Sequence, residues 1–232
     1  MNKTRIEYLD YTWNPTVGCS GLNCAVRKDC WARKASKRRK HACLDCYLFK
    51  PHYHWERLRQ PLRRKKASRI GVGFEGDIFD SNFSIVGNQQ VFSIIEQATQ
   101  HTFVSLTKQS KNMLMFNRNW QTFPSNLWLG VTVNRKEDLH RIEDLKLTDA
   151  RIKFVSFEPL YEDLSDADLR GIDWIIVGAQ TRPKLYPKYN WVLALLQKQL
   201  PVFLKNNLLP ILCTDKPCQQ FPFENVGKAV AL

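Results

Sequence analysis

The 232-residue chain has no apolar run near the roughly 18–20 residues that are needed to cross a membrane. Its first residues, MNKTRIEYLDYTWNP, contain no apolar stretch of the kind that secretory signals carry, so we expect a cytoplasmic protein. The chain also contains neither a GxxxxGK phosphate loop nor a GxSxG nucleophile elbow. The sequence therefore gives no support to a P-loop nucleotidase or a serine hydrolase.

Acidic residues are scarce between residues 27 and 69, where 16 Lys/Arg face only three Asp/Glu. This segment carries a charge of +13, which equals the net charge of the whole chain. A concentrated basic region is typical of proteins that bind a phosphate-rich partner, although a solvated basic surface has the same composition. Interleaved aromatic and histidine side chains favour nucleic acid, because bases stack on such rings. The candidate contacts are Arg33, Lys37, Arg38, Arg39, Lys40, Arg63, Arg64, Lys65 and Lys66.

Strand-like and helix-like patterns alternate about every 25 residues, which indicates βαβ units and a mostly parallel sheet. We expect one domain over residues 1–232: a (β/α) barrel, partial or full, with a Cys-rich basic insertion after the first strand. The seven expected strands are 6–13, 69–76, 101–108, 126–133, 150–160, 173–180 and 201–206. The expected helices are 87–100, 110–120, 135–146 and 189–200.

Polar residues follow most of the expected strands, and in parallel α/β folds the carboxyl ends of the strands collect the functional groups. Each one taken singly is equally typical of a helix cap or a loop residue. Together they predict a polar ring at one mouth of a barrel. Its members are Asn14, Glu75, Asp77, Thr107, Lys108, Thr132, Asn134, Glu158, Gln180, Lys205 and Asn206.

Cysteine is abundant where positive charge is abundant, with five of the seven cysteines lying between residues 18 and 47. An odd number of cysteines in a cytoplasmic protein favours metal ligation or chemistry over disulfides. Zinc is one hypothesis, with Cys43-x2-Cys46 as a half-site and Cys24/Cys30 or Cys213/Cys218 as the other half. An iron–sulfur cluster is the second, and unligated cysteines are the third. For His52 and His54, contact with phosphate or base, or simple exposure, is favoured over metal ligation.

Several motifs together resemble a family of phage and bacterial proteins that is defined by a three-cysteine motif and grouped with radical S-adenosylmethionine barrels. They are TWNPTVGC (12–19), CWA (30–32), HWERLRQPLRRKK (54–66), GDIF (76–79), LTK (106–108), GVTV (130–133), VSFEPL (155–160), IDWIIVGAQ (172–180) and VFLKNN (202–207). The family motif ends in Cys-x2-Cys-Tyr-Ala. In this chain Cys24 and Cys30 are separated by five residues, and a distinct Cys-x2-Cys-Tyr occurs at 43–47.

The resemblance implies a [4Fe–4S] cluster and S-adenosylmethionine as cofactors. It places the cluster on Cys19, Cys24 and Cys30, with Cys19, Cys43 and Cys46 as the alternative. In the first case Cys43 and Cys46 are available for a second metal, zinc or an auxiliary cluster, together with Cys213 and Cys218.

The resemblance and the strand-end positions also suggest roles for other residues. Gly76, Asp77, Glu158 and Gln180 are the candidate cofactor contacts, and Lys108, Glu158 and Lys205 are the candidate catalytic residues. The implied activity is modification or repair of a substrate, with a base in DNA or RNA as the favoured one, using a flavodoxin- or ferredoxin-type electron donor. The alternative is a non-catalytic, zinc-containing nucleic-acid-binding protein.

Overall fold

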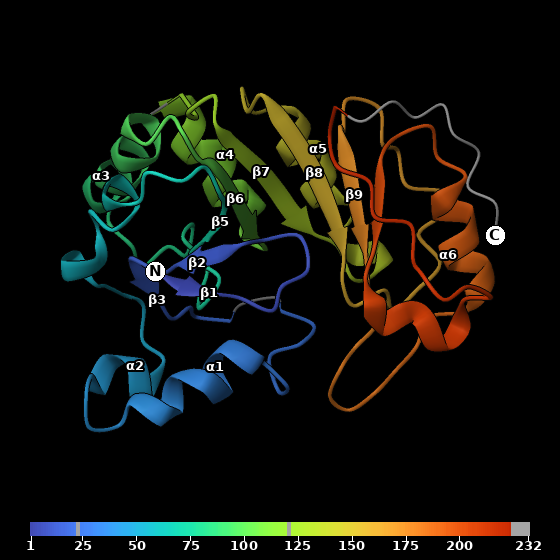
Figure 1. The fold of residues 1–232 in the computed structure, drawn as a ribbon, viewed down its shortest axis with the longest axis horizontal. Coiled ribbons are helices and arrows are strands. Elements are labelled where there is room, and N and C mark those ends of the chain that lie inside the picture. The colour runs from blue at the N-terminus through green and yellow to red at the C-terminus, as the bar shows by residue number, and fades with distance from the viewer. Residues whose placement is uncertain (22–23, 120–121, 224–232) are drawn as a thin grey trace. The chain divides into compact units, whose positions relative to one another are not determined.

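A computed structural model describes residues 1–21, 24–119 and 122–223 (Figure 1). The contacts between residues group the chain into two compact units. The first comprises Met1–Leu129 and Leu147–Arg151, and the second comprises Gly130–Lys146 and Ile152–Leu232. Each unit is described by itself below.

The first unit is built on parallel strands that follow the expected order. Strand β2 (Tyr11–Trp13) pairs in parallel with β5 (Arg69–Val72), which pairs in parallel with β6 (Thr102–Thr107). The short β1 (Asn2–Lys3) lies antiparallel on β2. Helices α3 (Ile85–Gln97) and α4 (Ser110–Asn119) follow β5 and β6. The rings of Phe79, Phe92, Phe116 and Phe123 form one aromatic cluster, with centroids 5.2–6.3 Å apart.

The cysteine-rich insertion forms short elements, of which α1 and α2 lie apart from α3 and α4 in Figure 1. Helix α1 (Trp31–Ser36) continues into a 3-10 turn (Lys37–Arg39), and α2 (Leu44–Leu48) follows after a break. The basic segment is therefore not one continuous helix. Strand β4 (His52–Tyr53) then pairs antiparallel with β3 (Thr16–Val17) in a separate two-stranded sheet. Two further 3-10 turns, Trp55–Arg57 and Pro61–Arg63, lead to β5.

The second unit has three parallel strands, β8 (Ile152–Phe157), β9 (Trp174–Val177) and β10 (Val202–Leu204). Its described part also contains helices α5 (His140–Lys146) and α6 (Tyr189–Leu196) and the 3-10 turns Lys136–Asp138 and Asn206–Ile211. Trp174 is fully buried between Phe154 and Phe203, with ring centroids 5.2 and 6.1 Å away.

The seven predicted strands are confirmed, each shorter than expected, and β7 (Leu127–Thr132) includes residues of both units. The strand order is β1-β2-β5-β6-β7-β8-β9-β10, so the fold is α/β with a mostly parallel sheet. In the part of the chain that the structure describes, this sheet is open at β1 and β10. The full form of the expected barrel is therefore not reached.

Within the described ranges, none of the helices has the length and apolar character that a bilayer span requires.

Gly18 provides a test of how tightly the insertion is packed on the sheet. It has a φ of +90°, and a Cβ there would lie 2.3 Å from the carbonyl oxygen of Lys50. Gly171, with a φ of +77°, has no atom within 4 Å of the same position. We expect Gly171→Ala to lower the free energy of unfolding by about 1–2 kcal/mol through backbone strain. Gly18→Ala adds a backbone clash, so its loss in urea denaturation should be roughly 2–5 kcal/mol. Equal losses would contradict the close approach.

Candidate metal centres

The carboxyl ends of β2, β5 and β6 are joined by side-chain and backbone hydrogen bonds within the first unit. Asn14, directly after β2, accepts from the backbone N–H of Glu75 at 3.2 Å. Asp77 is buried and accepts from the Thr107 hydroxyl at 2.7 Å and from the Lys108 N–H at 2.9 Å. The strand-end residues predicted for this half of the ring therefore do lie together.

The turn after β5 also pairs with the chain just before the first cysteine. The N–H of Gly18 donates to the Glu75 carbonyl at 3.0 Å, and Gly18 and Gly76 form a parallel bridge. A Cβ on Gly76 would lie 2.4 Å from the Gly18 carbonyl oxygen, so only glycine fits there. This contact fixes where the chain leaves β3 and reaches Cys19.

Cys19, Cys24 and Cys30 line one hollow with a volume of about 120 Å³. Arg27 and Arg33 line it as well. The Cys30 sulfur caps α1 by accepting from the Arg33 N–H at 3.5 Å. Three thiols and two arginines therefore share one hollow.

The Cys19 thiol is half-buried near two carboxyl groups, Asp77 and Asp80. Burial, followed by the charge of Asp77, raises the pKa of its thiol to about 12. The next residue, Ser20, donates to the Asp80 carboxylate through its N–H at 2.7 Å and its hydroxyl at 2.6 Å. The raised pKa favours the neutral thiol, so binding of a metal by Cys19 would release a proton.

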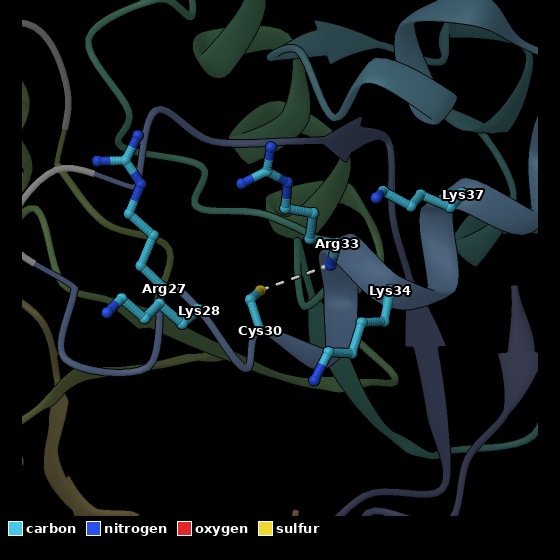
Figure 2. A pocket seen from close by; sticks show the side chains of 6 residues that line it. All are labelled: Arg27, Lys28, Cys30, Arg33, Lys34 and Lys37. Atoms are coloured by element: carbon cyan, nitrogen blue, oxygen red, sulfur yellow. Dashed lines mark hydrogen bonds between the residues drawn. The ribbon is translucent and has the colours of Figure 1, made fainter.

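A larger hollow of about 490 Å³ adjoins Cys30 and is lined almost entirely by cations. Figure 2 shows the Cys30 thiol among the side chains that line it: Arg27, Lys28, Arg33, Lys34 and Lys37. Arg27, Cys30 and Arg33 belong to both hollows. A polyanion bound in this larger hollow would therefore lie next to the cysteines.

A second centre is formed by Cys43, Cys46, His52 and His54, whose candidate ligand atoms all lie within 4.8 Å of one another. This group could bind a metal ion. The Nε2 atom of His54 is 3.1 Å from the Cys46 sulfur and 3.0 Å from Nε2 of His52. His52 Nε2 is 3.4 Å from the Cys43 sulfur and 3.5 Å from the Cys46 sulfur.

Arg39 links this second centre to the end of β5. Its guanidinium group approaches the Cys46 sulfur at 3.7 Å and forms a two-pronged ion pair with Glu75 at 2.5 and 2.6 Å. Its hydrogen bond to Glu75 raises the pKa of Arg39. Arg39 was predicted to contact nucleic acid, whereas here it is half-buried and engaged inside the protein.

The other predicted nucleic-acid contacts differ in exposure. Arg64 is half-buried, lies 4.1 Å from the centre of the Tyr11 ring and donates to Ser68. The remaining seven, which are Arg33, Lys37, Arg38, Lys40, Arg63, Lys65 and Lys66, are exposed.

The polar strand ends of the second unit pair among themselves. Lys205 donates to Glu158, and the Tyr161 hydroxyl donates to Gln180 at 2.5 Å. Asn134 donates to the Pro159 carbonyl at 2.8 Å. The cofactor and catalytic roles expected for Glu158, Gln180 and Lys205 stay predictions.

Cys213 and Cys218 were one of the two candidate pairs expected to join Cys43 and Cys46. Among the described residues, the group that could hold a single ion instead combines Cys43 and Cys46 with two histidines. Cys213 is exposed, and the Cys218 sulfur donates to the Val202 carbonyl at 3.7 Å.

A family model described as "Protein of unknown function (DUF5131)" matches residues 3–200. The chain belongs to the DUF5131 family. A search of the curated proteins and a search of the solved structures each found no match.

The DUF5131 match includes the insertion with both cysteine centres and the strands from β2 to β9. It ends before β10, Cys213 and Cys218. The centres therefore lie within the family region, although the match itself assigns no chemistry to them.

The sequence favoured contact with phosphate or base, or simple exposure, over metal ligation for His52 and His54. Their signal was a His-x-His pair six residues after a Cys-x2-Cys pair, which is a compact spacing for four ligands of one ion. Cys43 caps α2 and Cys46 lies in its first turn, and the left-handed end of the helix at Phe49 turns the chain back toward the cysteines.

Asp80 provides a test of the order in the loop after Cys19. Burial opposes ionisation, but hydrogen bonds from Ser20 and Asn82 outweigh it and lower the pKa of Asp80 below 3.8. Its contribution to stability is therefore present above pH 3.8 and is lost as the pH falls through the lower pKa of the folded state.

We expect Asp80→Ala to lower the free energy of unfolding by about 1–3 kcal/mol at neutral pH in urea denaturation. The difference from the wild type should shrink below a pH of about 3.8. The exposed Asp166 is the control, since its removal should change stability by less than about 0.5 kcal/mol. A loss for Asp80→Ala that does not vary with pH would argue against this ionised cap.

Proposed function

We propose that this chain is a radical S-adenosylmethionine-type enzyme that modifies or repairs a base in nucleic acid. The observation that carries the proposal is that Cys19, Cys24 and Cys30 line one hollow next to the strand-end turn at 75–77. The motif resemblance, from TWNPTVGC onward, implies the same three cysteines.

In this proposal Cys19, Cys24 and Cys30 hold a [4Fe–4S] cluster. When bound, the cluster and S-adenosylmethionine supply a radical that removes a hydrogen atom from the substrate, after one electron is delivered by a flavodoxin- or ferredoxin-type donor. The side chains of Arg27 and Arg33 offset the negative charge of the thiolates. Cys43 and Cys46 lie with two histidines, which favours this ligand set over Cys19, Cys43 and Cys46.

The turn at 75–77 would help to position the cofactor. Its backbone is fixed by Gly18 on one side and by Asn14 on the other. The Asp77 carboxylate already accepts hydrogen bonds from Thr107, Lys108 and Phe79, so its task is to hold this turn and the Lys108 backbone in place. Gly76 allows the close approach to the cysteine loop that any larger residue would prevent.

The cationic hollow supports a polyanionic substrate. Five basic side chains surround it, and it shares Cys30 with the cysteine hollow. Trp31, which follows Cys30, is 56% exposed and offers a ring on which a base could stack. An enzyme that acts on a base needs the base single-stranded or turned out of the duplex, and this arrangement suits either case.

The Cys43, Cys46, His52 and His54 group favours a second candidate, a non-catalytic zinc protein that binds nucleic acid. Both candidates account for the basic surface, but only the first requires iron at the other three cysteines. Iron content therefore separates them.

We expect protein prepared without oxygen to contain about four iron and four sulfide per chain. Cys30→Ser should lose most of this iron and all cleavage of S-adenosylmethionine under reducing conditions. Cys213→Ser, which changes an exposed cysteine outside the hollow, is the control and should keep both. Iron that is unaffected by Cys30→Ser, or wild-type protein without iron, would exclude the radical enzyme.

Affinity for a single-stranded oligonucleotide should fall steeply as salt rises, because cations on the protein replace counterions on the phosphates. Arg27→Ala/Lys28→Ala should weaken binding and reduce the slope of log K against log salt by about 1.4. Arg182→Ala/Lys184→Ala removes two exposed cations of the second unit and should leave the slope unchanged. Fluorescence anisotropy over a salt series measures both slopes, and equal slopes would count against the cationic hollow as the binding site.

A further inference from the structure

We propose that Cys43, Cys46, His52 and His54 bind one Zn²⁺ as a closed structural centre, and that this centre braces the wall of the cysteine hollow. From the sequence, Cys43 and Cys46 were expected to share a metal with other cysteines, whereas here they lie with two histidines. The proposal does not depend on the enzymatic function, since it concerns a different metal on different ligands.

Four of the six distances between the candidate ligand atoms are close to those around a single tetrahedral ion. Zinc lies about 2.3 Å from sulfur and about 2.0–2.1 Å from nitrogen, so a tetrahedron separates two nitrogens by about 3.3 Å and sulfur from nitrogen by about 3.5 Å. The two Nε2 atoms are 3.0 Å apart, and three of the four sulfur–nitrogen separations are 3.1–3.5 Å. The remaining ligand pairs lie within 4.8 Å. The four atoms are thus already placed around one point.

Both histidines are oriented as metal ligands by a partner on the opposite ring nitrogen. Nδ1 of His52 lies 2.8 Å from the Lys50 carbonyl, and Nδ1 of His54 lies 2.7 Å from the Glu56 carboxylate. Such partners fix the tautomer, so that Nε2 of each ring carries a lone pair toward the ion. A surface histidine that contacts phosphate would have no need of this arrangement.

The sulfurs are equally prepared for the charge of thiolates. The Cys43 sulfur caps α2 by accepting from the Cys46 N–H at 3.4 Å, and Arg39 approaches the Cys46 sulfur. Two thiolates and two imidazoles in a tetrahedron are a standard donor set for zinc. A Rieske cluster uses the same four residues, but there the cysteines and histidines bind different irons. The short sulfur–nitrogen distances here leave room for one ion only.

The insertion has little apolar core of its own, which gives the metal a structural task. Leu44 and Leu48 of α2 are 65% and 45% exposed, and Trp31 of α1 is 56% exposed. Small units with so little buried apolar surface commonly depend on a metal to fold.

The zinc centre is connected to the cysteine hollow through α2 and β4. Its cysteines belong to the cap and first turn of α2, and Leu48 and Phe49 at the other end of α2 line that hollow. Its histidines flank Tyr53 of β4, which pairs with β3 directly before Gly18. One ion would thus fix both α2 and β4, which border Cys19.

The test is the zinc content of the full-length chain, measured by mass spectrometry of the metals. Wild-type protein should carry about one zinc per chain at this four-ligand site. His52→Ala/His54→Ala should lower this at least tenfold. His41→Ala/His140→Ala is the matched control, because it removes two exposed histidines outside the group and should leave zinc unchanged. Zinc retained by the His52/His54 variant, or absent from the wild type, would overturn the proposal.

A second set of measurements uses only wild-type protein, so it applies even if the His52/His54 variant does not fold. In wild-type protein, replacement of zinc by Co²⁺ should give the intense visible absorption of tetrahedral cobalt with thiolate ligands. Removal of zinc by a chelator should lower the melting temperature and expose the segment 31–50 to protease, and added Zn²⁺ should reverse both changes. An octahedral cobalt spectrum would contradict the closed site. An unchanged melting temperature and digestion pattern would contradict the bracing role.

Discussion

The backbone pairing between Gly18 and the turn at 75–77 is the contact on which the cysteine loop depends. It joins the end of β3 to the end of β5, and it needs glycine at 76 because a Cβ there would meet the Gly18 carbonyl oxygen. Gly18 itself is required by a different neighbour, the backbone of Lys50. Once Gly18 is fixed, Cys19 must emerge beside the strand ends that carry Asp77 and Asn14. Backbone packing thus places Cys19 at the strand ends, without any interaction of the cysteine side chains themselves.

Arg39 makes a second connection between the insertion and the turn at 75–77, through charged groups. Its planar group has enough donors to reach a sulfur and both oxygens of a carboxylate at once. In doing so it connects the Cys43, Cys46, His52 and His54 group to Glu75 in the same turn that holds Gly18. Thiols and positive charge are crowded into one stretch of sequence partly because some of that charge stabilises sulfur and carboxylate inside the protein.

The seven strands could be predicted because most of them are short apolar runs that end at a polar residue. Strands of a parallel sheet are buried on both faces, so their sequences are apolar wherever they lie in the sheet. Trp174, Ile175, Ile176 and Val177 of β9 are all buried, as a run buried on both faces requires. The insertion was less predictable, because its helices are only five or six residues long and are held by caps and side-chain contacts. Arg39 and Arg64 were indistinguishable from their exposed neighbours, since one basic residue in a run resembles another until its partner is known.

The sequence by itself determined the α/β class, the family, the excess of positive charge and the two groups of cysteines, since these depend on composition and local spacing. Only the tertiary structure decided which residues join Cys43 and Cys46. A metal site requires four atoms within a few ångströms, and the turn at Phe49 and the β3–β4 pairing bring His52 and His54 there. Spacing along the chain had instead suggested Cys24 and Cys30, or Cys213 and Cys218, because it does not give distances in space.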